Sequence, residues 1–141
     1  MKISILFFGL IVCGLIGYWY LRNAEIPLLH DVFLEGKWYA LEVAQNDEAR
    51  QRGLGERDHL CEQCAMLFVF DAPGQYGFWM RGMRFPLDII WLRDDTVVWV
   101  ERRIASESST IYRPSVSANR VLELNAGAGD SVQLGDQMRF R

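Results

Sequence analysis

The chain has 141 residues, of which 50% are hydrophobic and 13% aromatic, and its formal net charge is −3 at pH 7. This length is enough for one domain with its own core and a short appendage, without metal or disulfide support. The acidic balance and the absence of long runs of one charge argue against a nucleic-acid partner, which requires a basic face.

The first element is an apolar segment. Residues 3–21 read ISILFFGLIVCGLIGYWYL and carry no charge. As a helix this segment spans roughly 28 Å, close to the hydrocarbon thickness of a bilayer. The aromatic residues 18–20 stand where an interfacial belt is expected. We therefore expect residues 1–23 to be an uncleaved transmembrane anchor, with residues 3–21 in contact with membrane lipid.

Flanking charges indicate the orientation of this anchor. The amino terminus and Lys2 favour the cytoplasmic side, whereas Arg22 is soon balanced by Glu25 and Asp31. We expect a single-pass protein with a cytoplasmic amino terminus and its globular domain outside the cytoplasm.

Three alternatives to a retained anchor remain open. A cleaved signal peptide has a shorter apolar stretch and small residues at the cut, whereas Arg22 follows this segment closely. Lipid attachment at Cys13 expects a small residue where Val12 stands. A buried core helix normally keeps one polar face, which this segment lacks.

The remainder divides into a connector, residues 24–36, and a β-rich domain, residues 37–141. Alternating apolar residues predict a strand over 37–44. Asn46 as a cap and Gly53 as a terminator predict a short helix between them. An apolar run predicts a buried strand over 65–70.

Further strands follow at short intervals. The sequence predicts strands over 78–83, 85–92, 96–104, 121–125 and 137–141, with a hairpin turn at 93–95 and a Ser-rich surface loop over 105–119. Many short strands between turn signals are typical of a mainly β fold. We expect one compact β-sandwich or barrel-like domain with one short helix, and an α+β fold as the alternative.

Several motifs in this part of the chain occur in the order of a known family. The segment GMRFPLDIIWL is preceded by MLFVF and FWM, and it is followed by VLELNAG and LGD. From about Tyr39 onward the chain thus resembles the domain-of-unknown-function family 192, a prokaryotic family. The resemblance implies a compact β-sandwich-like fold, often behind an export or anchor segment, and it implies no reaction.

The family pattern falls on specific positions of this chain. They are Glu42, Arg50, Gly53, Leu54, Met66, Phe68, Phe70, Phe78, Trp79, Met80, Pro86, Leu87, Asp88, Ile89, Val121, Leu122, Glu123, Gly127, Gly135 and Asp136.

Four polar residues, Glu42, Arg50, Asp88 and Glu123, form the first candidate site. Asp88 interrupts an apolar run, and a carboxylate among such neighbours must be paired or hydrogen-bonded when buried. Convergent carboxylates would serve acid–base catalysis or bind a cation. Alternatively, Asp88 or Glu123 pairs with Arg50 or accepts hydrogen bonds from backbone amides at a turn.

The second candidate site is an aromatic and sulfur cluster beside Arg81, made up of Phe78, Trp79, Met80, Met83 and Phe85. Strand parity places Phe78 and Met80 on one face and Trp79 and Arg81 on the other. Trp79 beside Arg81 would suit a sugar or aromatic ligand, whereas the alternative is that these residues belong to the core.

The third candidate is the Cys61–Cys64 pair, preceded by His59. Outside the cytoplasm a local disulfide is the natural interpretation. A redox motif would normally open a helix, but here a strand follows. Zinc binding through His59 and both cysteines lacks an evident fourth ligand.

These observations leave three functions open. The first is a membrane-tethered extracytoplasmic binding or accessory domain without catalysis, whose ligand candidates are Glu42, Trp79, Met80, Arg81, Asp88 and Glu123. The second is an envelope enzyme or cation site that uses Asp88, Glu123 and Arg50. The third is a structural domain that binds envelope proteins. No motif indicates a nucleotide, cofactor or resident metal.

Overall fold

A computed structural model describes residues 30–141 and contains seven strands in one sheet. The elements of the described chain are β1 (Asp31–Leu34), β2 (Lys37–Ala44), α2 (Asp47–Arg52), β3 (Cys64–Gly74), β4 (Leu87–Arg93), β5 (Thr96–Ile104), β6 (Ala118–Asn125) and β7 (Arg139–Phe140). The strand order is β5-β4-β6-β3-β2-β1-β7. The prediction of a mainly β fold with one short helix is confirmed.

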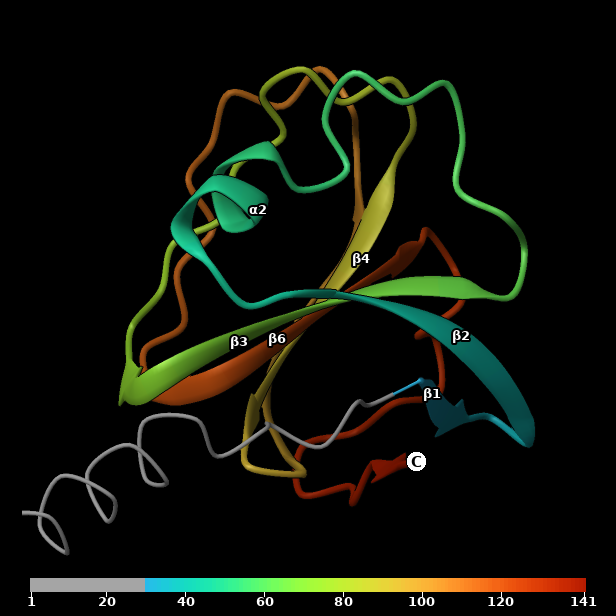
Figure 1. The fold of residues 1–141 in the computed structure, drawn as a ribbon, viewed down its shortest axis with the longest axis vertical. Helices are drawn as coiled ribbons and strands as arrows, with labels where there is room; N and C mark the ends of the chain where they lie inside the picture. Colours follow the sequence, from blue (N-terminus) through green and yellow to red (C-terminus); the bar gives the residue numbers. More distant parts are fainter. Residues whose placement is uncertain (1–29) are drawn as a thin grey trace, which may run out of the picture.

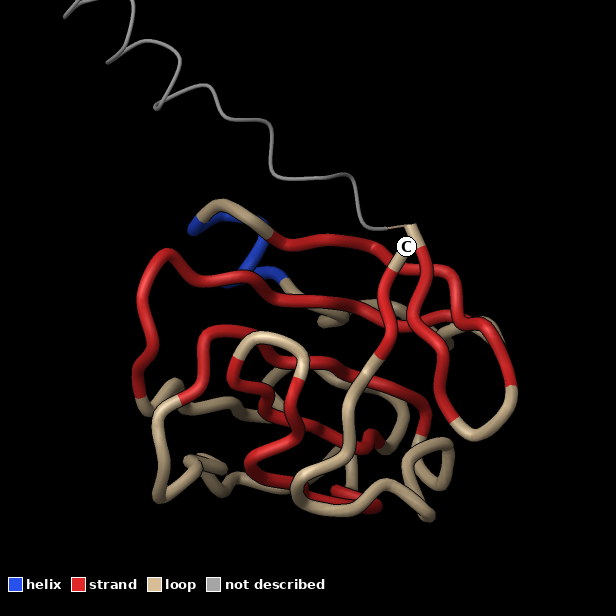
Figure 2. Tube along the Cα trace, turned by 90° about the horizontal axis from the view of Figure 1, so that it is seen from below, coloured by secondary structure: helices blue, strands red, loops and turns tan. Residues whose placement is uncertain are grey.

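The sheet curls strongly, so that its strands bend around part of the domain as a half-barrel (Figures 1 and 2). Of the two expected forms, sandwich and barrel-like, the single curled sheet agrees with the barrel-like one. The predicted membrane anchor, residues 1–23, lies outside the described residues. Over residues 30–141, no helix combines the length and apolar character needed to cross a membrane.

The predicted helix forms because its ends are capped. The side chain of Asn46 accepts a hydrogen bond from the backbone N–H of Ala49 at 2.8 Å. Gly53 ends the helix with a positive φ of 50° and donates its N–H to the carbonyl of Ala49. Asp47 and Glu48 lie in the first turn, where their negative charges interact favourably with the helix dipole.

The predicted connector, residues 24–36, needs correction at its end. Residues Asp31–Leu34 form β1, which pairs with β2 in an antiparallel hairpin. The turn consists of Glu35 and Gly36, which both have positive φ, as a two-residue hairpin turn requires. Glu-Gly is a weaker turn signal than Asn-Gly, and the short strand is therefore easily mistaken for connector.

Strands β2 and β3 pair in parallel, and this pairing explains the helix between them. Parallel neighbours need a crossover connection, which here is residues 45–63. The crossover carries α2 across one face of the sheet. In Figure 1 the segments that join β3 to β4 and β5 to β6 lie on the same side of the sheet as α2.

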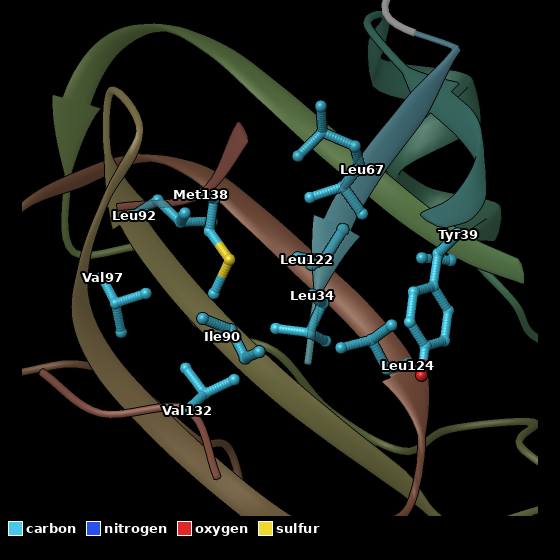
Figure 3. Close-up of a cluster of buried hydrophobic side chains, with 12 residues drawn as sticks. Leu34, Tyr39, Leu67, Ile90, Leu92, Val97, Leu122, Leu124, Val132 and Met138 are labelled. Carbon is cyan, nitrogen blue, oxygen red and sulfur yellow. The ribbon is translucent and has the colours of Figure 1, made fainter. Parts of the chain in front are cut away.

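The two faces of the sheet bury two separate apolar clusters. The first contains Leu34, Ile90, Leu122, Leu124, Val132 and Met138, whose side chains converge in Figure 3. The second contains Leu54, Met66, Phe68, Leu87, Ile89, Trp91 and Val121, and lies beneath α2 and the connecting segments. Successive side chains along β4 and β6 therefore point alternately into the first and the second apolar cluster.

The strand predicted over 78–83 does not form. The structure has a single β-bridge there, between Phe78 and Tyr112, within an otherwise irregular segment. Gly82 has a φ of 74°, which interrupts extended backbone. The predicted alternation nevertheless holds, because Met80 is buried and Trp79 is 48% exposed.

Candidate functional site

Asp88 is fully buried in β4, and its carboxylate accepts three backbone hydrogen bonds. The N–H of Arg103 donates to Oδ1 at 2.7 Å. The N–H groups of Gly127 and Gly129 donate to Oδ2 at 2.9 and 2.8 Å. Two residues of β5, Arg102 and Arg103, lie opposite the single residue Asp88 of β4, which makes a β-bulge. The bulge displaces the N–H of Arg103 from the strand ladder, and this N–H donates to the Asp88 carboxylate instead.

Glycine is required where the chain wraps around Asp88. Gly127 has a φ of 91°, a backbone conformation that L-residues with a side chain rarely adopt. A Cβ atom at Gly129 would lie 3.3 Å from Oδ2 of Asp88. The segment Gly127-Ala128-Gly129 therefore encloses the carboxylate. Of the two roles that the sequence left open, Asp88 has the structural one. Its partners are backbone amides, and Arg50 is not among them.

Glu123 lies on the opposite face of the sheet. In the β6 ladders it stands directly beside Met66 of β3 and Ile89 of β4, both of the second apolar cluster. Asp88, by contrast, pairs with Leu124, which belongs to the first cluster. The sheet therefore separates the two carboxyl groups, and no paired-carboxylate centre forms.

Glu123 is 5% exposed, and burial raises the pKa of its carboxyl to about 8. No described residue donates a hydrogen bond to this group, and desolvation is the sole cause of the pKa shift. Every fully buried side-chain nitrogen or oxygen in residues 30–141 has a partner. The unpartnered carboxyl of Glu123 is therefore open to the cavity beside it.

That cavity has a volume of about 220 Å³ and lies between α2, β3, β6 and the segment that follows β3. Glu123 contributes from β6, and helix α2 contributes Asp47, Arg50 and Gln51. The apolar lining residues are Leu54, Phe68, Phe70, Tyr76, Phe78, Trp79 and Met83. A concave site with aromatic walls and one buried polar group is typical of small-molecule binding.

Contacts among the rings hold these walls in place. Phe68 meets Phe78 edge-on, with ring centroids 4.9 Å apart. Phe70 stacks on Tyr76 at 3.6 Å, and the Tyr76 hydroxyl donates to the carbonyl of Ala72 at 2.7 Å. These contacts keep the rings fixed before any ligand binds.

Arg50 belongs to the wall of the cavity but pairs with neither Asp88 nor Glu123. Its guanidinium donates to the carbonyls of Gln45 and Val69 at 2.8 and 2.7 Å. It also forms an ion pair with Asp47 at 2.7 Å. Arg50 therefore fastens α2 to the end of β3.

The other predicted ligand residues divide into two groups. Trp79 and Arg81 both line the cavity, and the Arg81 guanidinium lies 5.5 Å from the Trp79 ring centroid. Met80 is buried in the second apolar cluster. Glu42 is outside the cavity and accepts two hydrogen bonds from Arg57, at 2.5 and 2.7 Å, which lower the pKa of Glu42.

Cys61 lies at disulfide-bonding distance from Cys64, which is the first residue of β3. The carbonyl of Cys61 accepts hydrogen bonds from the N–H of Cys64 and from the Asn125 side chain. Nowhere in residues 30–141 do three His, Cys, Asp or Glu side chains gather as metal ligands. The pair thus closes a turn at the entry to β3.

The sequence predicted part of the cavity lining, Phe78, Trp79 and Met83, as a candidate ligand site. It did not predict the contribution of Phe68, Phe70 and Tyr76. Phe68 and Phe70 resemble ordinary residues of a buried strand, and Tyr76 follows a turn. Their signal is in the sequence only through the family pattern, which includes both phenylalanines. Their convergence with Glu123 depends on the pairing of β3 with β6.

Comparisons with known proteins agree with this fold. The model of the domain-of-unknown-function family DUF192, described as "Uncharacterized ACR", matches residues 31–140. The resemblance predicted from the sequence motifs is thereby confirmed. No curated protein matches the chain.

Two solved structures are similar at 25% sequence identity. One is a candidate transcription regulator from Sinorhizobium meliloti 1021, with a TM-score of 0.72, covering 78% of this chain and 90% of its own. The other is a protein of unknown function from Novosphingobium aromaticivorans DSM 12444, with a TM-score of 0.73, covering 80% of this chain and 89% of its own.

Proposed function

Because the chain belongs to the domain-of-unknown-function family 192, whose membership implies no reaction, we propose its function from the site: it is a binding domain for a small ligand. The observation that carries this proposal is the unpartnered carboxyl of Glu123 at an aromatic cavity of about 220 Å³. A buried polar group without a partner is unfavourable in the empty protein and becomes favourable when a ligand satisfies it.

The geometry favours binding over catalysis. Asp88, the expected partner of Glu123, is on the other face of the sheet and is saturated by backbone N–H groups. Arg50 is held by backbone carbonyls and Asp47. The second carboxyl of the lining, that of Asp47, is paired with Arg50. Among the described residues, no second acid or base is thus placed to act with Glu123.

A cavity-blocking variant tests this function. Gln51 is exposed on α2 and lines the cavity, so Gln51→Trp should fill the cavity without disturbing the core. Glu48→Trp places the same side chain on the same helix away from the cavity. We expect compounds from a set of small amines, amides, carboxylic acids and sugars to raise the melting temperature of the wild-type full chain and of Glu48→Trp, but not of Gln51→Trp. If no compound does so, or if Gln51→Trp responds equally, the proposal fails.

The proposal includes a location: a retained anchor at residues 1–23 would hold the domain on the outer face of a membrane. The apolar segment supports the anchor, and the adjacent cysteines suit an oxidising compartment. The Sinorhizobium protein is described as a candidate transcription regulator, but the net charge of −3 on this chain offers poor attraction for DNA.

The cysteines provide a test of this location. In full-length protein isolated from membranes under non-reducing conditions, thiol alkylation should label Cys13 but neither Cys61 nor Cys64. After reduction, all three should be labelled. Two alkylated thiols at Cys61 and Cys64 before reduction would contradict the location. A Cys61→Ser, Cys64→Ser double variant should lose roughly 2 kcal/mol of stability, since the closed loop is short.

A further inference from the structure

Among the residues of the described chain that line the cavity, Glu123 alone carries a nearly enclosed polar group without a partner in residues 30–141. The neighbouring side chains in its row of the sheet, Met66 and Ile89, are apolar. A ligand that enters far enough to reach Glu123 must therefore itself supply the hydrogen-bonding or ionic partner of the carboxyl. This requirement limits the class of ligand that the site can bind. The inference about that class rests on the proposed binding function.

The other charged or titratable residues that line the cavity donate nothing to Glu123. Arg50 is committed to backbone carbonyls and Asp47, and the Tyr76 hydroxyl to a carbonyl. Arg81 lies over Trp79. Arg52, the remaining charged lining residue, is exposed at the end of α2.

The aromatic rings around the cavity favour a positively charged ligand group beside the Glu123 carboxyl. A cation near an aromatic face is attracted by the negative side of the ring system, and more strongly where water is excluded. Phe68, Tyr76 and Phe78 contribute to the lining, whereas the Phe70 ring already has the Arg50 guanidinium 5.2 Å from its centroid. Aromatic walls with one carboxyl at the enclosed end are complementary to an alkylammonium group, whose methylene or methyl groups contact the rings.

We propose that the cavity binds small aliphatic ammonium compounds, with the cationic nitrogen directed at the carboxyl of Glu123. Since burial raises the pKa of Glu123 to about 8, the carboxyl is protonated in the empty cavity at neutral pH. When the cation binds, the carboxyl ionises and its proton passes to the solvent. Affinity therefore rises with pH by up to about tenfold per unit below this pKa, and it levels off above it.

Choline and n-butylammonium are suitable probes, because each has a neutral analogue of similar shape: 3,3-dimethyl-1-butanol and 1-butanol. Calorimetric titration of the wild-type full chain near neutral pH should show each cation binding at least about tenfold more tightly than its alcohol. Titrations in phosphate and in MOPS, which differ in ionisation enthalpy, should show release of about one proton per bound cation.

The variant Glu123→Gln keeps the shape of the side chain but cannot ionise. In this variant the ratio of cation to alcohol affinity should fall to about one, and no proton should be released. Equal ratios in wild type and Glu123→Gln, or cation binding without proton release, would overturn the proposal.

The Gln51→Trp variant separates this inference from the function on which it rests. If compounds bind and Gln51→Trp blocks them, but cations show no preference over alcohols, the cavity is a binding site for another ligand class. If neither cations nor alcohols are blocked by Gln51→Trp, binding in the cavity is itself refuted.

Discussion

Asp88→Asn should destabilise the domain by about 3 kcal/mol and lower its melting temperature by roughly 10 °C. The carboxylate accepts three backbone hydrogen bonds on its two oxygens, from Arg103, Gly127 and Gly129. An asparagine side chain has one oxygen, and its NH2 group would face at least one of these N–H donors. The buried donor left without an acceptor accounts for most of the loss.

Chemical denaturation of the wild type and the variant measures this difference. Asp58→Asn is a matched control, because Asp58 is exposed and its ion pair with Arg84 is a surface one. That control should change stability by less than about 1 kcal/mol. Unchanged stability in Asp88→Asn would contradict the structural role of Asp88. Asp88 would then again be a candidate ligand-binding residue.

Glu123→Gln should have the opposite effect at alkaline pH, where it should make the domain more stable than the wild type. The pKa of Glu123 is raised from 4.5 to about 8 in the folded chain. Between these values the unfolded chain loses a proton that the folded chain keeps. Stability of the wild type should therefore fall as pH rises, by up to roughly 1.4 kcal/mol per pH unit.

The amide of the variant stays neutral, and this part of the pH dependence should disappear. Urea denaturation at several pH values would show the two proteins diverging from about pH 5 and differing by several kcal/mol near pH 8. Glu48→Gln, which changes an exposed glutamate on α2, should retain the wild-type slope. Parallel curves for the wild type and Glu123→Gln would show that Glu123 has a partner in solution.

Local sequence patterns were enough to predict the elements whose signals are local. Asn46 and Gly53 mark the two ends of α2, and both perform the expected capping. Residues 93–95 lie at the predicted hairpin between β4 and β5. In each case the residue that sets the backbone conformation lies within the element or beside it.

The arrangement of the site could not be predicted in this way. Parity assigns Asp88 to the same face of β4 as Ile90, and Glu123 to the face of β6 opposite Leu122. Whether those two faces coincide depends on which strands pair and in which register. The observed partners, Ile90 beside Leu122, put the carboxyl groups on opposite sides.

The segment before β4 shows how a pattern alone can mislead. Phe78 and Met80 alternate with Trp79 and Arg81 as in a half-buried strand. This segment lacks a continuous strand partner in the described chain and lies across the second apolar cluster. A loop packed on a flat apolar surface buries alternate side chains for the same reason that a strand does, and sequence periodicity does not distinguish the two.

Carboxyl ¹³C NMR of Glu123 across a pH titration of the full chain tests the central claim, which is that this group is enclosed beside the cavity without a protein partner. Glu123→Gln identifies its resonance. We expect a titration midpoint near the pKa of about 8 in the ligand-free protein. A midpoint near 4.5, the value of an unperturbed glutamate, would mean that solvent or a protein donor already satisfies the carboxyl, and the proposed ligand site would lose its basis.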